Sequence, residues 1–386
     1  MSEPNTKSGA QPAQGSDTRT GADVRGTDAG NAAGAGSNSG STLASAANAG
    51  AATMMNTSKR AFHWPWEASL TVLLIAALVL GRSLSPDFLG AANISNMLAD
   101  FTEIALMALP MTLIIVAAEI DLSVASVLGA SSALMGVLWH MGLPMPLVIV
   151  IVLVAGTLAG LLNGLVIVKL NLPSLAVTIG SLAFFRGLAY VLLGDQAIAD
   201  FPAAYTAFGI NTVGGSFLPQ PFVLVLIGAV VFCVLLQATA FGRSLYAIGA
   251  NPTAAAFSGL DVNRTKLKLF VVSGAMSALA GVVYTLRFTS ARGDNGEGFE
   301  LSVIAAVLFG GVSIFGGRGS MIGVLLSLVI IGVLRNALTL IDVSSEVLTI
   351  ITGALLLSSV LIPNLFNRWR SMRERRALAA RAAASW

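Results

Sequence analysis

The sequence predicts an all-α polytopic membrane protein, and three observations carry that prediction. Of its 386 residues, 55% are hydrophobic and only 11% are charged, whereas soluble domains carry about 25% charged residues. The mean hydropathy is +0.81. Apolar stretches of about 20 residues, the length that crosses the hydrocarbon core of a bilayer, recur along the chain. This composition argues against a water-soluble enzyme.

The two ends of the chain differ in composition from its middle. Residues 1–58 are rich in Gly, Ala, Ser, Asn and Thr and contain no aromatic residue, so they cannot bury enough apolar surface to become ordered. We expect a disordered cytoplasmic tail there, and not a signal peptide, because no apolar stretch follows a basic start. Residues 62–366 are expected to form the transmembrane domain, and residues 367–386 a basic cytoplasmic C-terminal tail.

About ten transmembrane helices are expected. The 40 glycines suit this class of protein, because small residues let membrane helices pack closely. The eighth segment is short, which favours a broken or partly re-entrant helix. The expected spans cover residues 66–84, 99–118, 123–139, 145–168, 173–193, 220–240, 268–286, 301–315, 321–340 and 344–362.

The basic residues predict the orientation, because cytoplasmic loops carry an excess of Lys and Arg. With ten spans and a cytoplasmic N-terminus, the C-terminus is also cytoplasmic. Only Arg82, Arg287 and Arg292 then fall outside. The basic residues that fall inside near helix ends are Lys59, Arg60, Lys169, Arg243, Arg264, Lys266, Lys268, Arg318, Arg368, Arg370, Arg373, Arg375, Arg376 and Arg381.

Two pairs of segments indicate an internal repeat. Residues 121–129 (Asp-Leu-Ser-Val-Ala-Ser-Val-Leu-Gly) are similar to residues 300–310, which begin Glu-Leu-Ser-Val, and residues 162–165 are similar to 335–338. The first copy would start the third span and the second copy the eighth. Those spans run in opposite directions, so the repeat is expected to be inverted, as in many transporters. Chance similarity between apolar segments is the alternative.

Missing motifs exclude several kinds of chemistry. The chain has no G-x-x-x-x-G-K-[ST] phosphate-binding loop, and His63 and His140 have no companion metal ligands. Residues 316–320 (Gly-Gly-Arg-Gly-Ser) are glycine-rich but are expected to form a tight turn. The basic residues flank apolar runs and form no single surface for nucleic acid. We therefore expect a protein that is not an enzyme and that binds no metal or cofactor of its own.

Polar residues inside apolar segments are costly and often functional. Arg335 lies in such a segment. A charge at a helix end that reaches the membrane interface is an equally good interpretation for Glu119 and Asp121. Asn163 and Asn336 could line a polar path or hold two helices together by hydrogen bonds. The candidates for the translocation path are Glu119, Asp121, Asn163, Arg186 and Asn336.

A short helix is expected within the long connection 241–267. Asn is a favoured N-cap, Pro suits the first helical position, and Gly suits the position after the last turn. A two-turn helix alone in a loop is marginal unless it docks on something, which makes this segment a candidate docking site. Its residues are Asn251, Pro252, Thr253, Ala254, Ala255, Ala256, Phe257, Ser258 and Gly259.

Four motifs follow one another along the chain, at residues 120–126, 242–264, 299–306 and 310–320. Together they resemble the permease subunits of ribose-type ABC importers, and the resemblance covers about residues 66–362. Residues 242–264 correspond to the coupling-helix region of that family. The long N-terminal tail and Ala337, where the family more commonly has Gly, depart from the pattern.

The resemblance implies a multi-pass permease of the bacterial inner membrane and a set of partners. These are a second permease subunit (the same chain or a paralogue), two cytoplasmic ATPase domains that bind ATP and Mg, and an extracytoplasmic sugar-binding protein. Within the family the chain most resembles rhamnose and autoinducer-2 permeases, partly through residues 290–296. The expected function is import of a monosaccharide-like solute, rhamnose or a related sugar. The alternative is a stand-alone secondary transporter or facilitator of small polar solutes.

Overall fold

The computed structural model describes residues 66–344, 346–351, 353, 354, 357, 358, 361 and 372. The expected tails 1–58 and 367–386 lie outside these residues, apart from Met372, and the expected tenth span is described only in part. The described part belongs to one compact unit, Trp64–Trp386. Its α-helices are α2 (Trp66–Leu84), α3 (Ala91–Asp100), α4 (Thr102–Val116), α5 (Val124–His140), α6 (Met145–Leu170), α7 (Ser174–Leu193), α8 (Ala203–Ile210), α9 (Phe222–Gln237), α10 (Ala240–Ala250), α11 (Pro252–Phe257), α12 (Val262–Phe288), α13 (Phe299–Phe309) and α14 (Met321–Thr339).

The helices confirm the all-α membrane class. Five of them (α2, α6, α7, α12 and α14) are individually long and apolar enough to cross a membrane, and two bent pairs raise the number to seven among the described residues. The count of ten, the inverted repeat and the cytoplasmic termini stay predictions. The bounds of α2 are those expected from the sequence, and each of the first nine expected spans overlaps a helix.

Three elements differ from the sequence expectation. The second span is a pair, α3 and α4, bent by 46° at Phe101, and α9 continues into α10 after a 66° bend. The connection 241–267 is therefore mostly helical, because α10 fills its start and α12 begins at Val262. The eighth span is α13, which is short, as expected, but it begins at Phe299 and ends at Phe309, before the expected end at residue 315. Hydropathy averaged over a window gives the length of an apolar run but not the direction of the helix axis, so it detects neither of the two bends.

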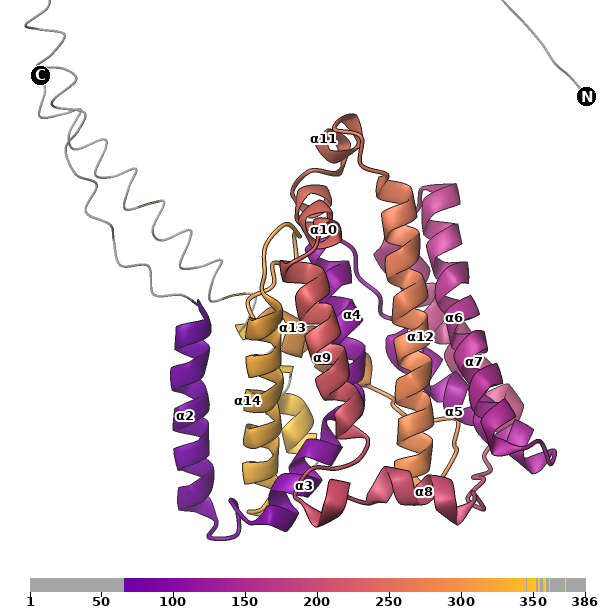
Figure 1. Cartoon of the computed structure of the whole chain (residues 1–386), viewed down its shortest axis with the longest axis vertical. Helices are drawn as coiled ribbons and strands as arrows, with labels where there is room; N and C mark the ends of the chain where they lie inside the picture. The colour runs from indigo at the N-terminus through magenta and orange to yellow at the C-terminus, as the bar shows by residue number, and fades with distance from the viewer. Residues whose placement is uncertain are drawn as a thin grey trace, which may run out of the picture. The chain divides into compact units, whose positions relative to one another are not determined.

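Helix α4 lies at the centre of the bundle. All fifteen of its residues are buried, and it packs against α12, α13 and α9 (Figure 1). Helix α12 also packs along α6, where a Cβ atom at Gly160 would lie 2.1 Å from the carbonyl oxygen of Phe270. Small residues thus let these two helices approach closely, as membrane helices do. Helix α2 packs on α14 at one side of the bundle.

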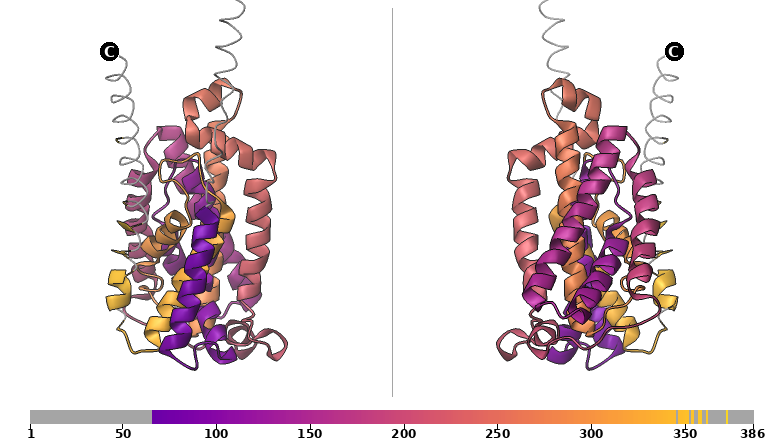
Figure 2. Two further views of the ribbon diagram at one scale, coloured as in Figure 1. Left: turned by 90° about the vertical axis from the view of Figure 1, so that its left-hand side faces the viewer. Right: turned by 90° about the vertical axis from the view of Figure 1, so that its right-hand side faces the viewer.

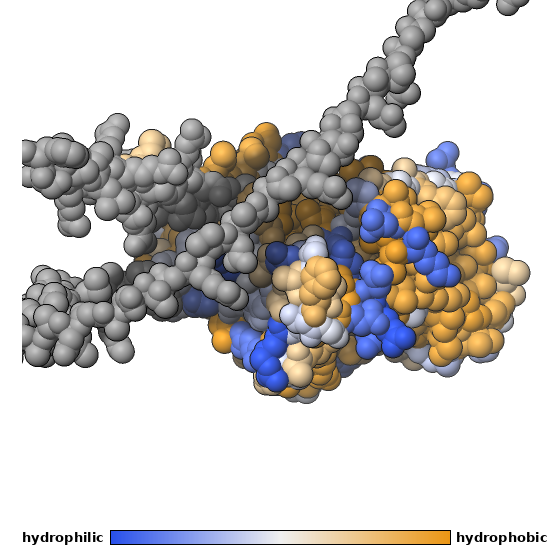
Figure 3. All heavy atoms as spheres, turned by 90° about the horizontal axis from the view of Figure 1, so that it is seen from above, coloured by the Kyte–Doolittle hydropathy of each residue, from blue (hydrophilic) through white to orange (hydrophobic). Residues whose placement is uncertain are grey.

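The two ends of the bundle are different in construction. Helices α10 and α11 stand at one end, and the side views show that α11 projects beyond the ends of the long helices (Figure 2). Helices α3 and α8 lie at the opposite end (Figure 1). We call these the α11 end and the α8 end. Seen from the α11 end, hydrophilic patches lie among apolar side chains (Figure 3).

Candidate functional site

Helix α11 has the caps that its sequence predicts. The Asn251 side chain accepts a hydrogen bond from the backbone N–H of Ala254 at 3.0 Å, with Pro252 as the first helical residue. Gly259 follows the helix with φ +85°, a left-handed conformation that favours glycine at this position. The side chain of Phe257 is 90% exposed. Helix α11 therefore presents a large apolar side chain with no burial site among the described residues.

The surface beneath α11 is firmly packed. The backbone N–H of Gly317 donates to the carbonyl oxygen of Val116, the last residue of α4, at 2.8 Å, and the Tyr246 hydroxyl of α10 donates to the carbonyl oxygen of Gly319 at 2.8 Å. Gly316, Gly317 and Gly319 all have positive φ, which confirms the expected tight turn between α13 and α14. These bonds join α10, the end of α4 and the turn 316–319 into one platform.

Glu119 lies at the same end, just past α4, and forms an ion pair with Lys266 in the first turns of α12. The Glu119 residue is buried, and the Lys266 side chain is 22% exposed. The pairing explains how a carboxylate is accommodated there, because a charge inside protein is costly unless it has a partner. Glu119 therefore connects α4 to α12 near the platform.

Asp121 and Asn163 belong to one buried hydrogen-bond network. Asp121 accepts from the backbone N–H and the hydroxyl of Ser123 at 3.0 and 2.6 Å, and from the Ser273 hydroxyl of α12 at 2.7 Å. Asn163 of α6 donates to the Ser123 hydroxyl at 2.9 Å and accepts from Ser181 of α7 at 2.5 Å. The network ties the start of α5 to three helices. Whether either residue also contributes to a path stays a prediction.

Arg186 binds backbone carbonyls and not a carboxylate. Its guanidinium donates to the carbonyl oxygens of Gly293 at 2.8 Å and Asn295 at 2.9 Å, so that α7 holds the loop 289–298. In that loop Arg292 donates to both carboxylate oxygens of Asp294 at 2.8 and 2.9 Å. These hydrogen bonds hold the pKa of Asp294 below its usual value. The loop is thus fixed from within and from α7.

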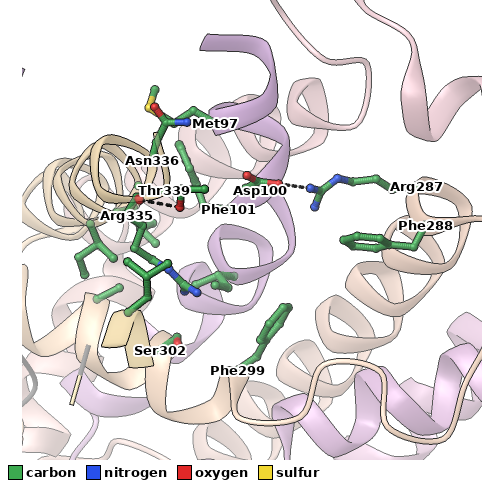
Figure 4. Close-up of a pocket in the computed structure, with 16 residues that line it drawn as sticks. Met97, Asp100, Phe101, Arg287, Phe288, Phe299, Ser302, Arg335, Asn336 and Thr339 are labelled. Carbon is green, nitrogen blue, oxygen red and sulfur yellow. Dashed lines mark hydrogen bonds and ion pairs between the residues drawn. The ribbon is translucent and has the colours of Figure 1, made fainter. Parts of the chain in front are cut away.

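Asn336 lines a cavity, which Figure 4 shows in close-up. The cavity has a volume of about 240 Å³ and lies between α3, the end of α12, α13 and α14. Asn336 donates to Asn93 at 2.9 Å and accepts from it at 2.8 Å, which supports the helix-packing interpretation of this residue as well. Arg335, its neighbour on α14, also lines the cavity.

An ion cluster that the sequence did not predict lies beside this cavity. Arg287, at the end of α12, pairs with Asp100 of α3 and, through Nη1, with Glu103 of α4 at 3.2 Å. The Glu103 side chain is 1% exposed. The sequence does contain a signal for this cluster: two carboxylates, Asp100 and Glu103, at the start of the second expected span. Carboxylates in such a segment need a cationic partner. That partner is more than 180 residues away in sequence.

The described residues contain no group of three or more His, Cys, Asp or Glu side chains that could hold a metal ion. Cys233, on α9, is a free cysteine. The candidate functional features among the described residues are therefore the exposed helix at the α11 end and the cavity toward the α8 end.

Comparison with known proteins gives the relatives of the chain. Residues 93–360 match the family described as branched-chain amino acid transport system / permease component. The autoinducer 2 import system permease protein LsrD of Escherichia coli (strain K12) is 36% identical over 301 residues, which are 76% of this chain and 91% of that protein. The protein of the same name from Shigella flexneri has the same identity and coverage. No solved structure is a significant match.

Proposed function

The chain belongs to the family of permease components of branched-chain amino acid transport systems, and from that premise we propose which solute it carries and what drives the transport. It is the permease subunit of an ABC importer and a multi-pass protein of the inner membrane, and it is not an enzyme. The proposed solute is a monosaccharide-like molecule. Autoinducer 2, named for its relatives, and rhamnose are the two candidates.

The driving force in this proposal is ATP hydrolysis on a separate ATPase subunit that docks on α11. The observation that carries the proposal is the 90% exposed side chain of Phe257 on a capped helix that projects from the bundle. A helix this short is marginal unless it docks on a partner. The chain itself has no phosphate-binding loop, so ATP and Mg would be bound by the partner. Because the ATPase subunit is cytoplasmic in this proposal, its docking on α11 makes the α11 end cytoplasmic and the α8 end the outer face.

The proposed assembly contains a second permease subunit, either another copy or a paralogue, with two ATPase domains and an extracytoplasmic binding protein. The binding protein would deliver the solute to the α8 end. The residues of this chain would form half of a path between the two permeases, and the two ends of the bundle would open in turn as ATP binds and is hydrolysed.

The test is uptake by proteoliposomes that contain the permease, its partner ATPase and the binding protein. We expect uptake of labelled autoinducer 2 or L-rhamnose that requires both ATP and the binding protein. The alternative, a stand-alone secondary transporter, predicts uptake by the permease alone when an ion gradient is imposed. Uptake without ATPase or binding protein would therefore refute the proposal.

A further inference from the structure

We propose that the cavity toward the α8 end is a binding site for an uncharged, polyhydroxylated solute, in which Arg335 is the main hydrogen-bond donor. This inference rests on the proposed function for its orientation, since that function makes the α8 end the outer face. It adds to that function a site on the permease itself, with its own selectivity.

The first argument is the guanidinium of Arg335. Arg335 lies on α14, lines the cavity and points into it (Figure 4). Within the described part of the chain its side chain forms no hydrogen bond and no ion pair, and the residue is only partly exposed. A guanidinium presents a rigid fork of five N–H donors. The oxygens of neighbouring hydroxyl groups on a solute are acceptors that such a fork can bind two at a time.

The second argument is the other polar groups on the wall. Ser302 and Thr339 supply hydroxyls, each of which can donate and accept. Asp100 lies across the cavity from α14 and pairs with Arg287 (Figure 4), but its side chain is still 66% exposed. A carboxylate in that position can accept hydrogen bonds from solute hydroxyls. Donors and acceptors thus face each other across the cavity, as a solute with both kinds of group requires.

The third argument is charge. The cavity is lined by Arg287, Arg335 and Asp100, and Glu103 pairs with Arg287. These are two guanidinium groups and two carboxylates. Their formal charges sum to zero. An anionic solute would meet Asp100, and a cationic solute would meet Arg335, so neither would enter with a net electrostatic gain. A neutral solute suits this wall best.

The fourth argument is size and shape. The rings of Phe101, Phe288 and Phe299 supply apolar wall, against which the C–H face of a sugar ring can pack. The volume of about 240 Å³ is below the range of about 300–1,000 Å³ typical of sites for drug-sized ligands. It therefore favours a solute of monosaccharide size. The placement at the α8 end puts the site where a solute released by a binding protein would first meet the permease.

The experiment uses the assembled importer in membrane vesicles, with Cys233→Ala as the background. Ser302→Cys places a thiol on the cavity wall, and its reaction with a membrane-impermeant methanethiosulfonate is timed from the outer side. Autoinducer 2, L-rhamnose and D-ribose are the neutral probes, and D-gluconate and D-glucosamine the charged ones. We expect labelling from outside that at least one neutral probe slows fivefold or more and that neither charged probe slows.

A matched control distinguishes a probe that occupies the cavity from a probe that slows thiol labelling everywhere on the protein. Ser216 lies in an exposed segment between α8 and α9. No probe should slow the labelling of the Ser216→Cys variant. The inference is overturned if Ser302→Cys is not labelled from outside, if no neutral probe protects it, or if D-gluconate protects it equally. Protection in vesicles that show no ATP-dependent uptake would support the site while refuting the proposed function, so the two failures can be told apart.

A second variant tests Arg335 directly. Arg335→Gln removes the charge and most of the donors, and we expect KM for uptake of the protecting probe to rise tenfold or more. Arg82→Gln, at the exposed end of α2, is the matched control and should leave KM and basal ATPase activity unchanged. An unchanged KM in Arg335→Gln would overturn the role of this residue. If that variant does not assemble, the Ser302→Cys measurement still decides whether the site exists.

Discussion

The exposure of Phe257 gives a quantitative prediction for the contact between permease and ATPase. The side chain is 90% exposed in this chain, so a groove on the ATPase could bury nearly all of it. Full burial of a phenylalanine side chain stabilises a complex by about 1.5–3 kcal/mol. At about 1.4 kcal/mol for each factor of ten, Phe257→Ala should weaken ATPase binding about 10- to 150-fold per site.

The assay compares binding of the purified ATPase to solubilised wild-type and Phe257→Ala permease. The melting temperature of the permease alone should not change, because an exposed side chain contributes little to its folding. Phe217→Ala, an exposed phenylalanine in the segment between α8 and α9, is the matched control and should bind the ATPase normally. A Kd for Phe257→Ala within twofold of the wild-type value would refute the docking of the ATPase on α11.

Three further predictions concern the packing around the two ends. Gly249→Val places a Cβ atom 1.9 Å from the carbonyl oxygen of Val116, so it should displace α10 and abolish ATP-driven uptake, which the proteoliposome assay measures. Arg186→Leu removes charged hydrogen bonds worth about 1.5–3 kcal/mol each and should speed protease cleavage in the loop 289–298. Glu103→Gln should lower the free energy of unfolding, and with it the melting temperature. The loss should be at most the roughly 3–5 kcal/mol of a broken buried pair, because a second carboxylate still pairs with Arg287.

Local patterns in the sequence predicted the local structure well. The bounds of α2 and the caps of α11 follow from neighbouring residues: an apolar run flanked by Glu67 and Arg82 in one case, and Asn251 with Gly259 in the other. Such signals act over a few residues, so no knowledge of the tertiary fold is needed. The turn at 316–319 belongs to the same group, because its glycines allow the positive φ values that the turn requires.

The polar contacts between helices could not be predicted in the same way. The sequence singled out Asp121 and Asn163 but not Ser273, the α12 residue whose hydroxyl Asp121 accepts. Likewise the sequence assigned Arg287 to the outer side but did not reveal that it pairs with Glu103. Pairings of this kind depend on which helices become neighbours, and hydropathy gives the length of a helix but not its neighbours.

Helix α12 links the two regions on which the proposals depend. It runs for 27 residues, about 40 Å at 1.5 Å per residue, from the α11 loop to the cavity toward the α8 end. Lys266 near its start pairs with Glu119 just past α4, and Arg287 near its end pairs with Glu103 at the start of α4. Because ion pairs fasten the two helices at both ends and a close-packed core lies between them, we expect them to move as one unit. A displacement of α11 by the ATPase would then tilt this unit and change access to the cavity, so that hydrolysis on another chain controls solute entry on this one.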